Sequence, residues 1–196
     1  CLDPIDGTKG FLRGDQFAVA LAWIVDGQVQ VAALGCPNLV AGYLPKADGA
    51  GSLSFAVRGE GAWTMPLESN EDALSPLHVS DCGNPRQARL LRSFESGHTN
   101  VNQVDRFAQE LEVKVEPIRM DSQPKYSILA AGQAEVYVRL LSPQQPDYKE
   151  RIWDQAAGSL LVEEAGGRVT DLDGQPLDFA AGRLLRNNRG ILATNG

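Results

Sequence analysis

Positive charge is scarce in this chain of 196 residues, which has 18 Lys plus Arg against 25 Asp plus Glu and a net charge of −7. Proteins that bind nucleic-acid polymers gain much of their affinity from clustered basic residues that neutralise phosphates. The charge balance therefore argues against such a partner. A small anionic substrate is still compatible with it, provided that metal ions supply the missing positive charge.

Cysteine is also rare, and long apolar runs are absent. Cys1, Cys36 and Cys82 are odd in number and not in C-x-x-C spacing, which indicates neither a disulfide framework nor a zinc site and favours a reducing compartment. No run approaches the ~20 apolar residues of a membrane helix, so we expect a soluble protein without a membrane partner. We expect the cytoplasm, or an organelle such as the chloroplast or mitochondrion. A targeting segment is not visible, because the chain opens directly inside a motif.

That motif, Cys1-Leu2-Asp3-Pro4-Ile5-Asp6-Gly7-Thr8, places two carboxylates and a hydroxyl on a tight turn. Pro4 pushes Asp3 toward an extended conformation and Gly7 permits a backbone reversal, which predicts Asp3 at a strand end with Asp6 curled back beside it. Two carboxylates so close repel each other unless a hard cation such as Mg²⁺ neutralises them. The alternative is an Asx-type turn with exposed acids.

The first half of the chain predicts antiparallel sheet. Asp26-Gly27 lies between β-prone runs over 17–25 and 28–34, which is a strong hairpin signal. Residues 17–22 are nearly all apolar, so we expect this strand to be covered on both faces. Residues 9–15 read as a glycine-punctuated loop, and 52–58 as a further strand. A change of composition near residues 82–87 predicts a boundary between an N-terminal domain, 1–85, and a C-terminal domain, 86–196.

The second half predicts strands alternating with helices, and hence an α/β layered domain. Helical spacing of apolar residues indicates a helix over 101–112, and Ser122 followed by Pro124 indicates the N-cap and first turn of another helix reaching Ala131. A further helix is expected from Asp154 to Gly166. Strands are expected over 89–94, 113–119, 134–140, 168–170 and 190–194.

A second notable motif is Trp153-Asp154-Gln155-Ala156-Ala157-Gly158, which runs into Glu163-Glu164-Ala165-Gly166-Gly167. An aspartate at a helix start is most often only an N-cap. The small Ala156-Ala157-Gly158 face, however, allows this helix to pack very close to another backbone, which would bring Asp154 onto a site rather than out into solvent. Trp153 reads as core packing.

Together, D-P-I-D-G-T and W-D-Q-A-A-G with the trailing E-E-A-G-G resemble the two signatures of the inositol monophosphatase superfamily. Within it, K-G-F-L-R-G-D-Q-F at 9–17, S-G-H-T at 96–99, D-S-Q-P-K-Y at 121–126 and V-Y-V-R-L at 136–140 resemble the 3'(2'),5'-bisphosphate nucleotidase branch. The resemblance implies an α+β, αβαβα layered sandwich whose N-terminal helical part is missing from this chain. It also implies a Mg²⁺-dependent, lithium-sensitive phosphatase of sulfur metabolism that removes the 3'-phosphate of 3'-phosphoadenosine 5'-phosphate to give AMP. The phosphosulfate analogue is a second substrate that the resemblance implies.

Carried over residue by residue, the resemblance makes Asp3, Asp6 and Asp154 metal ligands together with the carbonyl of Ile5. It makes Thr8 and Asp6 the catalytic residues, with Thr8 as the hydroxyl that works with an acidic residue to orient and deprotonate the attacking water. The positions that match substrate binding are Thr8, His98, Ser122, Lys125, Arg139 and Asp154. We expect the 5'-phosphate at the first turn of the helix that carries Ser122 and Lys125, with a bidentate contact from Arg139.

One departure from the family pattern lowers the activity expected of residues 1–196. Relatives carry another metal-binding Glu and the acidic partner of the catalytic threonine upstream of D-P-I-D-G-T, and this chain begins two residues before that motif. We therefore expect residues 1–196 alone to bind metal weakly and turn over poorly. Two alternatives stay open: an inositol phosphate phosphatase, and a non-catalytic metal- or nucleotide-binding fragment. The sequence carries no signal for an oligomeric state.

Overall fold

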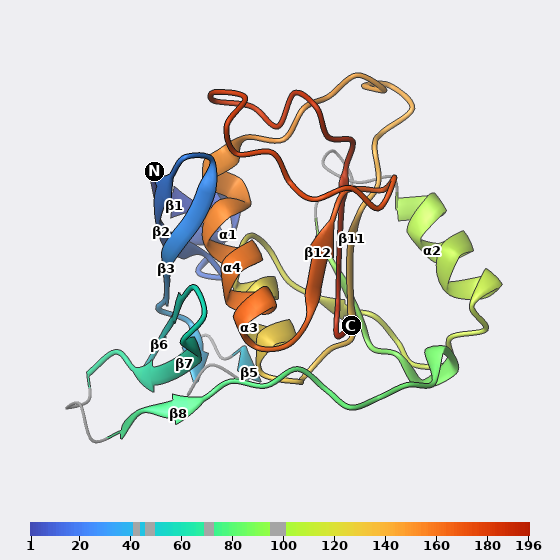
Figure 1. Ribbon diagram of the computed structural model, residues 1–196. Helices are drawn as coiled ribbons and strands as arrows, with labels where there is room; N and C mark the ends of the chain where they lie inside the picture. Colours follow the sequence, from blue (N-terminus) through green and yellow to red (C-terminus); the bar gives the residue numbers. More distant parts are fainter. Residues whose placement is uncertain (41–43, 46–49, 69–72, 95–100) are drawn as a thin grey trace.

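A computed structural model describes residues 1–40, 44–45, 50–68, 73–94 and 101–196. Two β-sheets enclose a pair of helices, α3 (Pro124–Ala130) and α4 (Ala156–Glu164), as Figure 1 shows. A third helix, α2 (Val101–Glu110), lies on the far side of the second sheet (Figure 1). The order sheet, helices, sheet, helix agrees with the layered α/β sandwich predicted from the sequence.

The first sheet is antiparallel throughout, with the strand order β1-β2-β3-β6-β7-β8. Asp26 and Gly27 join β2 to β3, and both have positive φ, 49° and 76°, as a two-residue hairpin turn requires. The predicted hairpin is therefore confirmed. The strands are β1 (Leu2–Asp6), β2 (Ala18–Val25), β3 (Gln28–Cys36), β6 (Ser52–Val57), β7 (Gly61–Pro66) and β8 (Ser75–Pro76), with a separate short pair β4 (Leu39–Val40) and β5 (Leu44–Pro45).

The expectation that residues 17–22 are covered on both faces is wrong. In β2, Ala18, Ala20 and Ala22 are buried, whereas Leu21 and Trp23 are 52% and 61% exposed. Small alanine side chains let α4 approach the inner face, and the large side chains alternate onto the outer face. That outer face is apolar across neighbouring strands, because Leu21 pairs with Leu2 and Ala33, and the row continues through Phe55 and Trp63.

The second sheet is mixed, with the order β10-β9-β11-β13-β12. β9 is parallel to β10 and β11, and β13 is antiparallel to β11 and β12. The strand predicted over 113–119 is reduced to its last two residues, and Val113 packs instead with the hydrophobic cluster that contains Val104 and Phe107 of α2. The bounds are β9 (Leu90–Arg92), β10 (Ile118–Arg119), β11 (Val136–Arg139), β12 (Arg168–Thr170) and β13 (Ile191–Thr194), with a short 3₁₀ turn η2 (Pro85–Gln87) before β9.

Close packing of α3 against α4 depends on Gly158. A Cβ atom at this position would lie 2.0 Å from Cδ2 of the Tyr126 ring, so only glycine fits. The small face predicted for this helix thus receives an aromatic side chain rather than a backbone. One continuous core contains buried residues from both sides of the boundary predicted near residue 85, among them Leu34, Leu91 and Leu161. The division into two domains stays a prediction.

The segment after the first motif is a helix, not the predicted loop. α1 (Thr8–Arg13) is bounded by Gly7 and Gly14, both in the left-handed region with φ of 90° and 73°. The glycines that suggested a loop therefore act as the two ends of a short helix. Among the residues that the structure describes, no helix is long and apolar enough to cross a membrane.

Candidate active site

A bulge in β1 brings the first two carboxylates to one side of the strand. Asp3 pairs with Ala20 and Asp6 with Ala18, so three steps along β1 match two steps along β2. Residues three apart in a regular strand point to opposite faces. The extra residue of the bulge turns Asp3 and Asp6 to the same side instead. Pro4 and Ile5, between the two aspartates, are exposed. The predicted proximity of Asp3 and Asp6 is present, but both lie within the strand.

The third carboxylate belongs to a residue in the other half of the chain. Asp154 closes a 3₁₀ turn, η3 (Ile152–Asp154), and Gln155 separates it from α4. It therefore does not open the α-helix as predicted. One carboxylate oxygen of Asp3, Asp6 and Asp154 each lies within 4.8 Å of the others. Oxygen donors so arranged suit a hard divalent cation such as Mg²⁺.

The surroundings make this cluster electrostatically costly without a cation. Burial raises the pKa of Asp154 to about 7, and the neighbouring carboxylate of Asp6 contributes to the rise. Burial also raises the pKa of Asp6, although the backbone N–H of Gln123 opposes this by donating to Asp6 Oδ2 over 2.7 Å. A bound cation would reverse the repulsion among the three groups, so the residues present fit a metal site.

Thr8 and Ile5 complete this end of the site. Thr8 is the first residue of α1, and its Oγ1 lies 3.5 Å from the carbonyl oxygen of Ile5, the atom predicted as a fourth metal ligand. Asp3 Oδ1 accepts a hydrogen bond from the Ile5 N–H over 3.1 Å, which is the Asx-type turn that the sequence also allowed. The turn occupies one oxygen of Asp3, so the two interpretations are compatible.

A cavity of about 570 Å³ opens beside the three carboxylates. Most of the substrate-binding positions predicted from the sequence line it, whereas His98 lies outside the residues that the structure describes. The predicted residues that line the cavity are Asp6, Thr8, Ser122, Lys125, Arg139 and Asp154.

Ser122 is not an N-cap, contrary to expectation. Gln123 occupies the cap position, and Ser122 adopts a left-handed backbone with φ of 55°. Its Oγ is buried without a hydrogen-bond partner in the described part of the chain, directly against Gly7. A buried unpaired hydroxyl at a cavity wall is a polar group in need of a partner. The free N–H groups expected at this helix start are partly used, because that of Gln123 binds Asp6.

Lys125 and Arg139 bring positive charge to the cavity from two elements, in addition to Lys9 and Arg151 in its lining. Lys125 is buried in α3, its Nζ donates to the carbonyl of Met120 over 3.2 Å, and it lies 5.2 Å from the centroid of the Tyr137 ring. Burial lowers the pKa of Lys125 to about 8, partly offset by Asp6. Arg139 ends β11 as predicted, and Glu150 lies 2.7 Å from its Nε.

Sequence reasoning missed several residues of the cavity and one residue behind it, Glu150. Asp121 and Gln123 stand inside the D-S-Q-P-K-Y motif, and they line the cavity next to Ser122. Asp121 forms an ion pair with Arg13 of α1. Their polar character beside an expected site was the available signal. Glu150 and Tyr148 fall in a proline-containing loop without periodicity, and nothing in that stretch indicated that they reach Arg139.

Comparison with known proteins decides the family. Residues 1–195 match the sequence profile of the inositol monophosphatase family. The chain belongs to this family. The resemblance inferred from the two motifs is therefore confirmed, and the fold agrees with it.

Family relatives named for one activity resemble the chain over nearly its whole length. The 3'(2'),5'-bisphosphate nucleotidase of Schizosaccharomyces pombe is 44% identical over 193 residues, covering 98% of this chain and 54% of that protein. The protein of the same name from Oryza sativa is 43% identical over 200 residues, covering 99% and 54%. The chain thus spans about half the length of these curated relatives.

Solved structures of the family share the fold. CysQ from Bacteroides thetaiotaomicron superposes with a TM-score of 0.72 at 24% identity, covering 98% of this chain and 68% of that one. Inositol monophosphatase from Anabaena gives a TM-score of 0.70 at 26% identity, covering 100% and 66%. The layered architecture is therefore that of inositol monophosphatases.

Proposed function

We propose that the protein containing this chain is a Mg²⁺-dependent phosphatase that removes the 3'-phosphate of 3'-phosphoadenosine 5'-phosphate to give AMP. The family and the names of the relatives support a phosphatase acting on a bisphosphorylated nucleotide. The phosphosulfate analogue is a second expected substrate, because it carries the same 3'-phosphate.

The observation that carries the proposal is the division of one cavity into an acidic and a basic part. Asp3, Asp6 and Asp154 converge within 4.8 Å, and Asp6 and Asp154 share the cavity lining with Lys125 and Arg139. The acidic part attracts a phosphate only through cations, whereas the basic part attracts an anion directly. A substrate with two separate phosphate groups satisfies both parts at once.

Each residue then has a defined task. Asp3, Asp6, Asp154 and the carbonyl of Ile5 would hold the metal, which when bound neutralises the phosphate and acidifies the attacking water. Thr8 places its hydroxyl beside the Ile5 carbonyl, where it can orient a water for in-line attack on phosphorus. Lys125 and Arg139 hold the second phosphate, so that the 3'-phosphate is presented to the carboxylates.

Phosphate release from 3'-phosphoadenosine 5'-phosphate tests the proposal, measured with Mg²⁺ and with a chelator. We expect hydrolysis that depends on Mg²⁺, and a higher kcat/KM than for inositol monophosphate. A higher kcat/KM for inositol monophosphate would make the protein an inositol phosphate phosphatase instead. Nucleotide binding without release of phosphate would indicate a non-catalytic binding module.

A second experiment compares the activity of residues 1–196 with that of a longer protein. We propose that residues 1–196 alone are weakly active, because relatives of about twice this length are the proteins named as nucleotidases. The same assay on residues 1–196 and on a longer gene product tests this. Equal Mg²⁺-dependent rates would show that no carboxylate outside these residues is required.

A further inference from the structure

A buried ion pair lies behind the basic part of the cavity. The side chain of Glu150 is 2% exposed and that of Arg139 is 15% exposed, and Arg139 Nε lies 2.7 Å from Glu150 Oε1. The charge of Arg139 also acts on Tyr137, whose pKa it lowers against the effect of burial, and its guanidinium carbon lies 5.9 Å from the centroid of the Tyr148 ring. Neither Arg139 Nε nor Glu150 Oε1 has a hydrogen-bond partner among the described residues, so the contact between them is an ion pair without hydrogen-bond alignment. A guanidinium has five N–H donors, which this ion pair does not use up. Donors therefore remain for a ligand in the cavity that Arg139 lines.

Glu150 is itself held from the other side. Its Oε2 accepts a hydrogen bond from Gln155 Nε2 over 3.0 Å, and Gln155 Oε1 accepts one from the Tyr126 hydroxyl over 2.5 Å. Gln155 and Tyr126 are 1% exposed, and the ring of Tyr126 is fixed against Gly158. This chain of contacts connects α3 and the start of α4 with the last residue of β11.

We propose that Glu150 is a positioning residue for substrate selection: it holds the Arg139 guanidinium toward the cavity, where Arg139 binds the substrate's second phosphate. Glu150 is not in the cavity lining and acts through Arg139. The inference rests on the proposed function, because it names the residue that prepares the second phosphate site.

A role for Glu150 in charge balance alone predicts tighter substrate binding when its charge is removed, whereas a positioning role predicts weaker binding. A carboxylate close to a phosphate site repels the phosphate, so removing the charge of Glu150 would strengthen substrate binding if the carboxylate served only to balance Arg139. If Glu150 fixes the direction of the guanidinium, its removal weakens binding, because Arg recognises phosphate through a fixed fork of donors. The sign of the change therefore separates the two roles.

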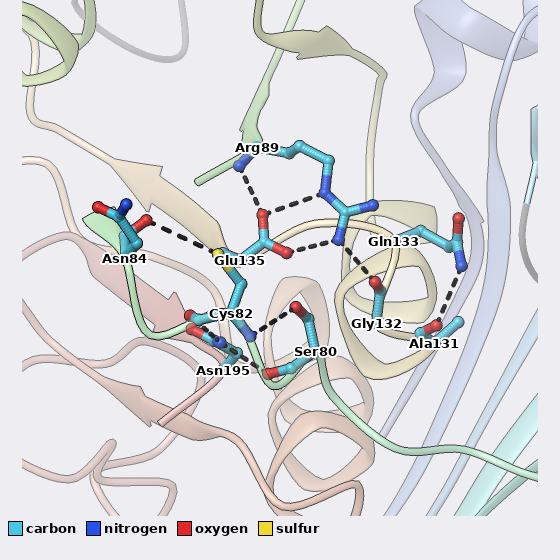
Figure 2. A network of polar contacts seen from close by, with 9 residues as sticks. All are labelled: Ser80, Cys82, Asn84, Arg89, Ala131, Gly132, Gln133, Glu135 and Asn195. Carbon is cyan, nitrogen blue, oxygen red and sulfur yellow. Dashed lines mark hydrogen bonds and ion pairs between the residues drawn. The ribbon is translucent and has the colours of Figure 1, made fainter. Parts of the chain in front are cut away.

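The chain offers a matched control in a second buried glutamate. Glu135 is also 2% exposed at its side chain and pairs with Arg89, in a network with Ser80, Gly132 and Asn195 away from the cavity (Figure 2). Glu135→Gln removes a buried Glu–Arg pair of the same kind. It reports what the loss of such a pair does to folding without touching the phosphate site.

Steady-state kinetics with two substrates test this role in wild type, Glu150→Gln, Glu150→Asp and Glu135→Gln. The substrates are the bisphosphate, 3'-phosphoadenosine 5'-phosphate, and the monophosphate, adenosine 3'-phosphate, which lacks the second phosphate. We expect both Glu150 variants to raise KM for the bisphosphate roughly tenfold and KM for the monophosphate less than twofold. The Asp variant keeps the charge but is one methylene shorter, so charge balance alone predicts no effect for it. We expect Glu135→Gln to leave both KM values within twofold of wild type.

Binding of AMP by calorimetry gives a readout independent of turnover. Glu150→Gln is expected to raise the Kd of AMP roughly tenfold in the wild-type background and less than twofold in an Arg139→Met background, because the residue acts through Arg139. An unchanged or lower Kd in Glu150→Gln, or an equal loss in both backgrounds, would overturn the inference. If wild type binds AMP but releases no phosphate, the proposed hydrolysis fails while the AMP data still decide the role of Glu150. If wild type binds no AMP, both proposals fall.

Discussion

Asp154→Asn is expected to stabilise the metal-free protein at pH 8. The pKa of Asp154 rises from 3.8 to about 7 on folding, chiefly through burial and then through the charge of Asp6. Each pKa unit corresponds to about 1.4 kcal/mol, so ionising this carboxyl in the folded protein costs about 4 kcal/mol relative to the unfolded chain. Solvent screening at the partly exposed group reduces this, and we expect a gain of about 2 to 4 kcal/mol from the neutral amide.

The pH dependence of the gain has a definite sign. The folded protein holds the Asp154 proton more tightly than the unfolded chain, so wild-type stability falls as the pH rises from about 4 to about 7. The asparagine variant lacks this loss. The difference in unfolding free energy between variant and wild type should therefore be small at pH 4 and reach its full value above pH 7.

Urea unfolding in a chelating buffer at pH 4, 6 and 8 measures this difference. Asp173→Asn is the control, because Arg189 lowers the pKa of Asp173, and this variant should be less stable than wild type at pH 8. With Mg²⁺ at about 100 times its Kd, wild type should gain about 2.7 kcal/mol and the Asp154 variant much less. If Asp154→Asn and wild type have the same free energy of unfolding at pH 8, or if they differ by the same amount at every pH, the reasoning is refuted.

Three further predictions concern single residues. Thr8→Val should lower kcat roughly 100-fold while Thr8→Ser retains most of it, since the hydroxyl beside the Ile5 carbonyl is the group required; steady-state kinetics measure both. Lys125→Met should weaken AMP binding and abolish the loss of affinity that wild type is expected to show as the pH rises above about 8, where Lys125 loses its proton; calorimetry across that range decides it. Gly158→Ala should destabilise the protein by about 1 to 3 kcal/mol, because the new methyl meets the Tyr126 ring, and an unchanged midpoint of thermal unfolding would contradict this contact.

Local patterns in the sequence predicted those parts of the fold that depend on local chemistry. The hairpin at Asp26-Gly27 needs two consecutive residues with positive φ, and this pair is one that adopts them easily. Helical spacing placed the helix over 101–112, and proline and glycine near the ends of the other two helices placed them approximately. The glycines flanking α1 misled the prediction, because a glycine that ends a helix and a glycine in a loop look the same in sequence.

Contacts between segments that are far apart in the sequence could not be predicted from local patterns. The motifs indicated Asp3, Asp6 and Asp154, but the bulge that turns Asp3 and Asp6 to one side depends on pairing with β2. Ser122 adopts a left-handed backbone, and Gly7, between β1 and α1, lies against its side chain, a contact between distant segments that no local pattern indicated. Glu150 reaches Arg139 only because the chain between β11 and η3 folds back on the cavity, and such a path leaves no periodic signal.

The apolar outer face of the first sheet gives the protein a built-in optical reporter. Trp23 lies on that face in β2, next to the edge strand β1, and is 61% exposed, whereas Trp63 on the same face is half-buried and stacks on Phe55. An indole in water emits at longer wavelengths than one in an apolar contact and is quenched readily by small solutes. The emission of Trp23, isolated by replacing Trp63 and Trp153 with Phe, would therefore shift to the blue and escape quenching whenever another surface covers the sheet.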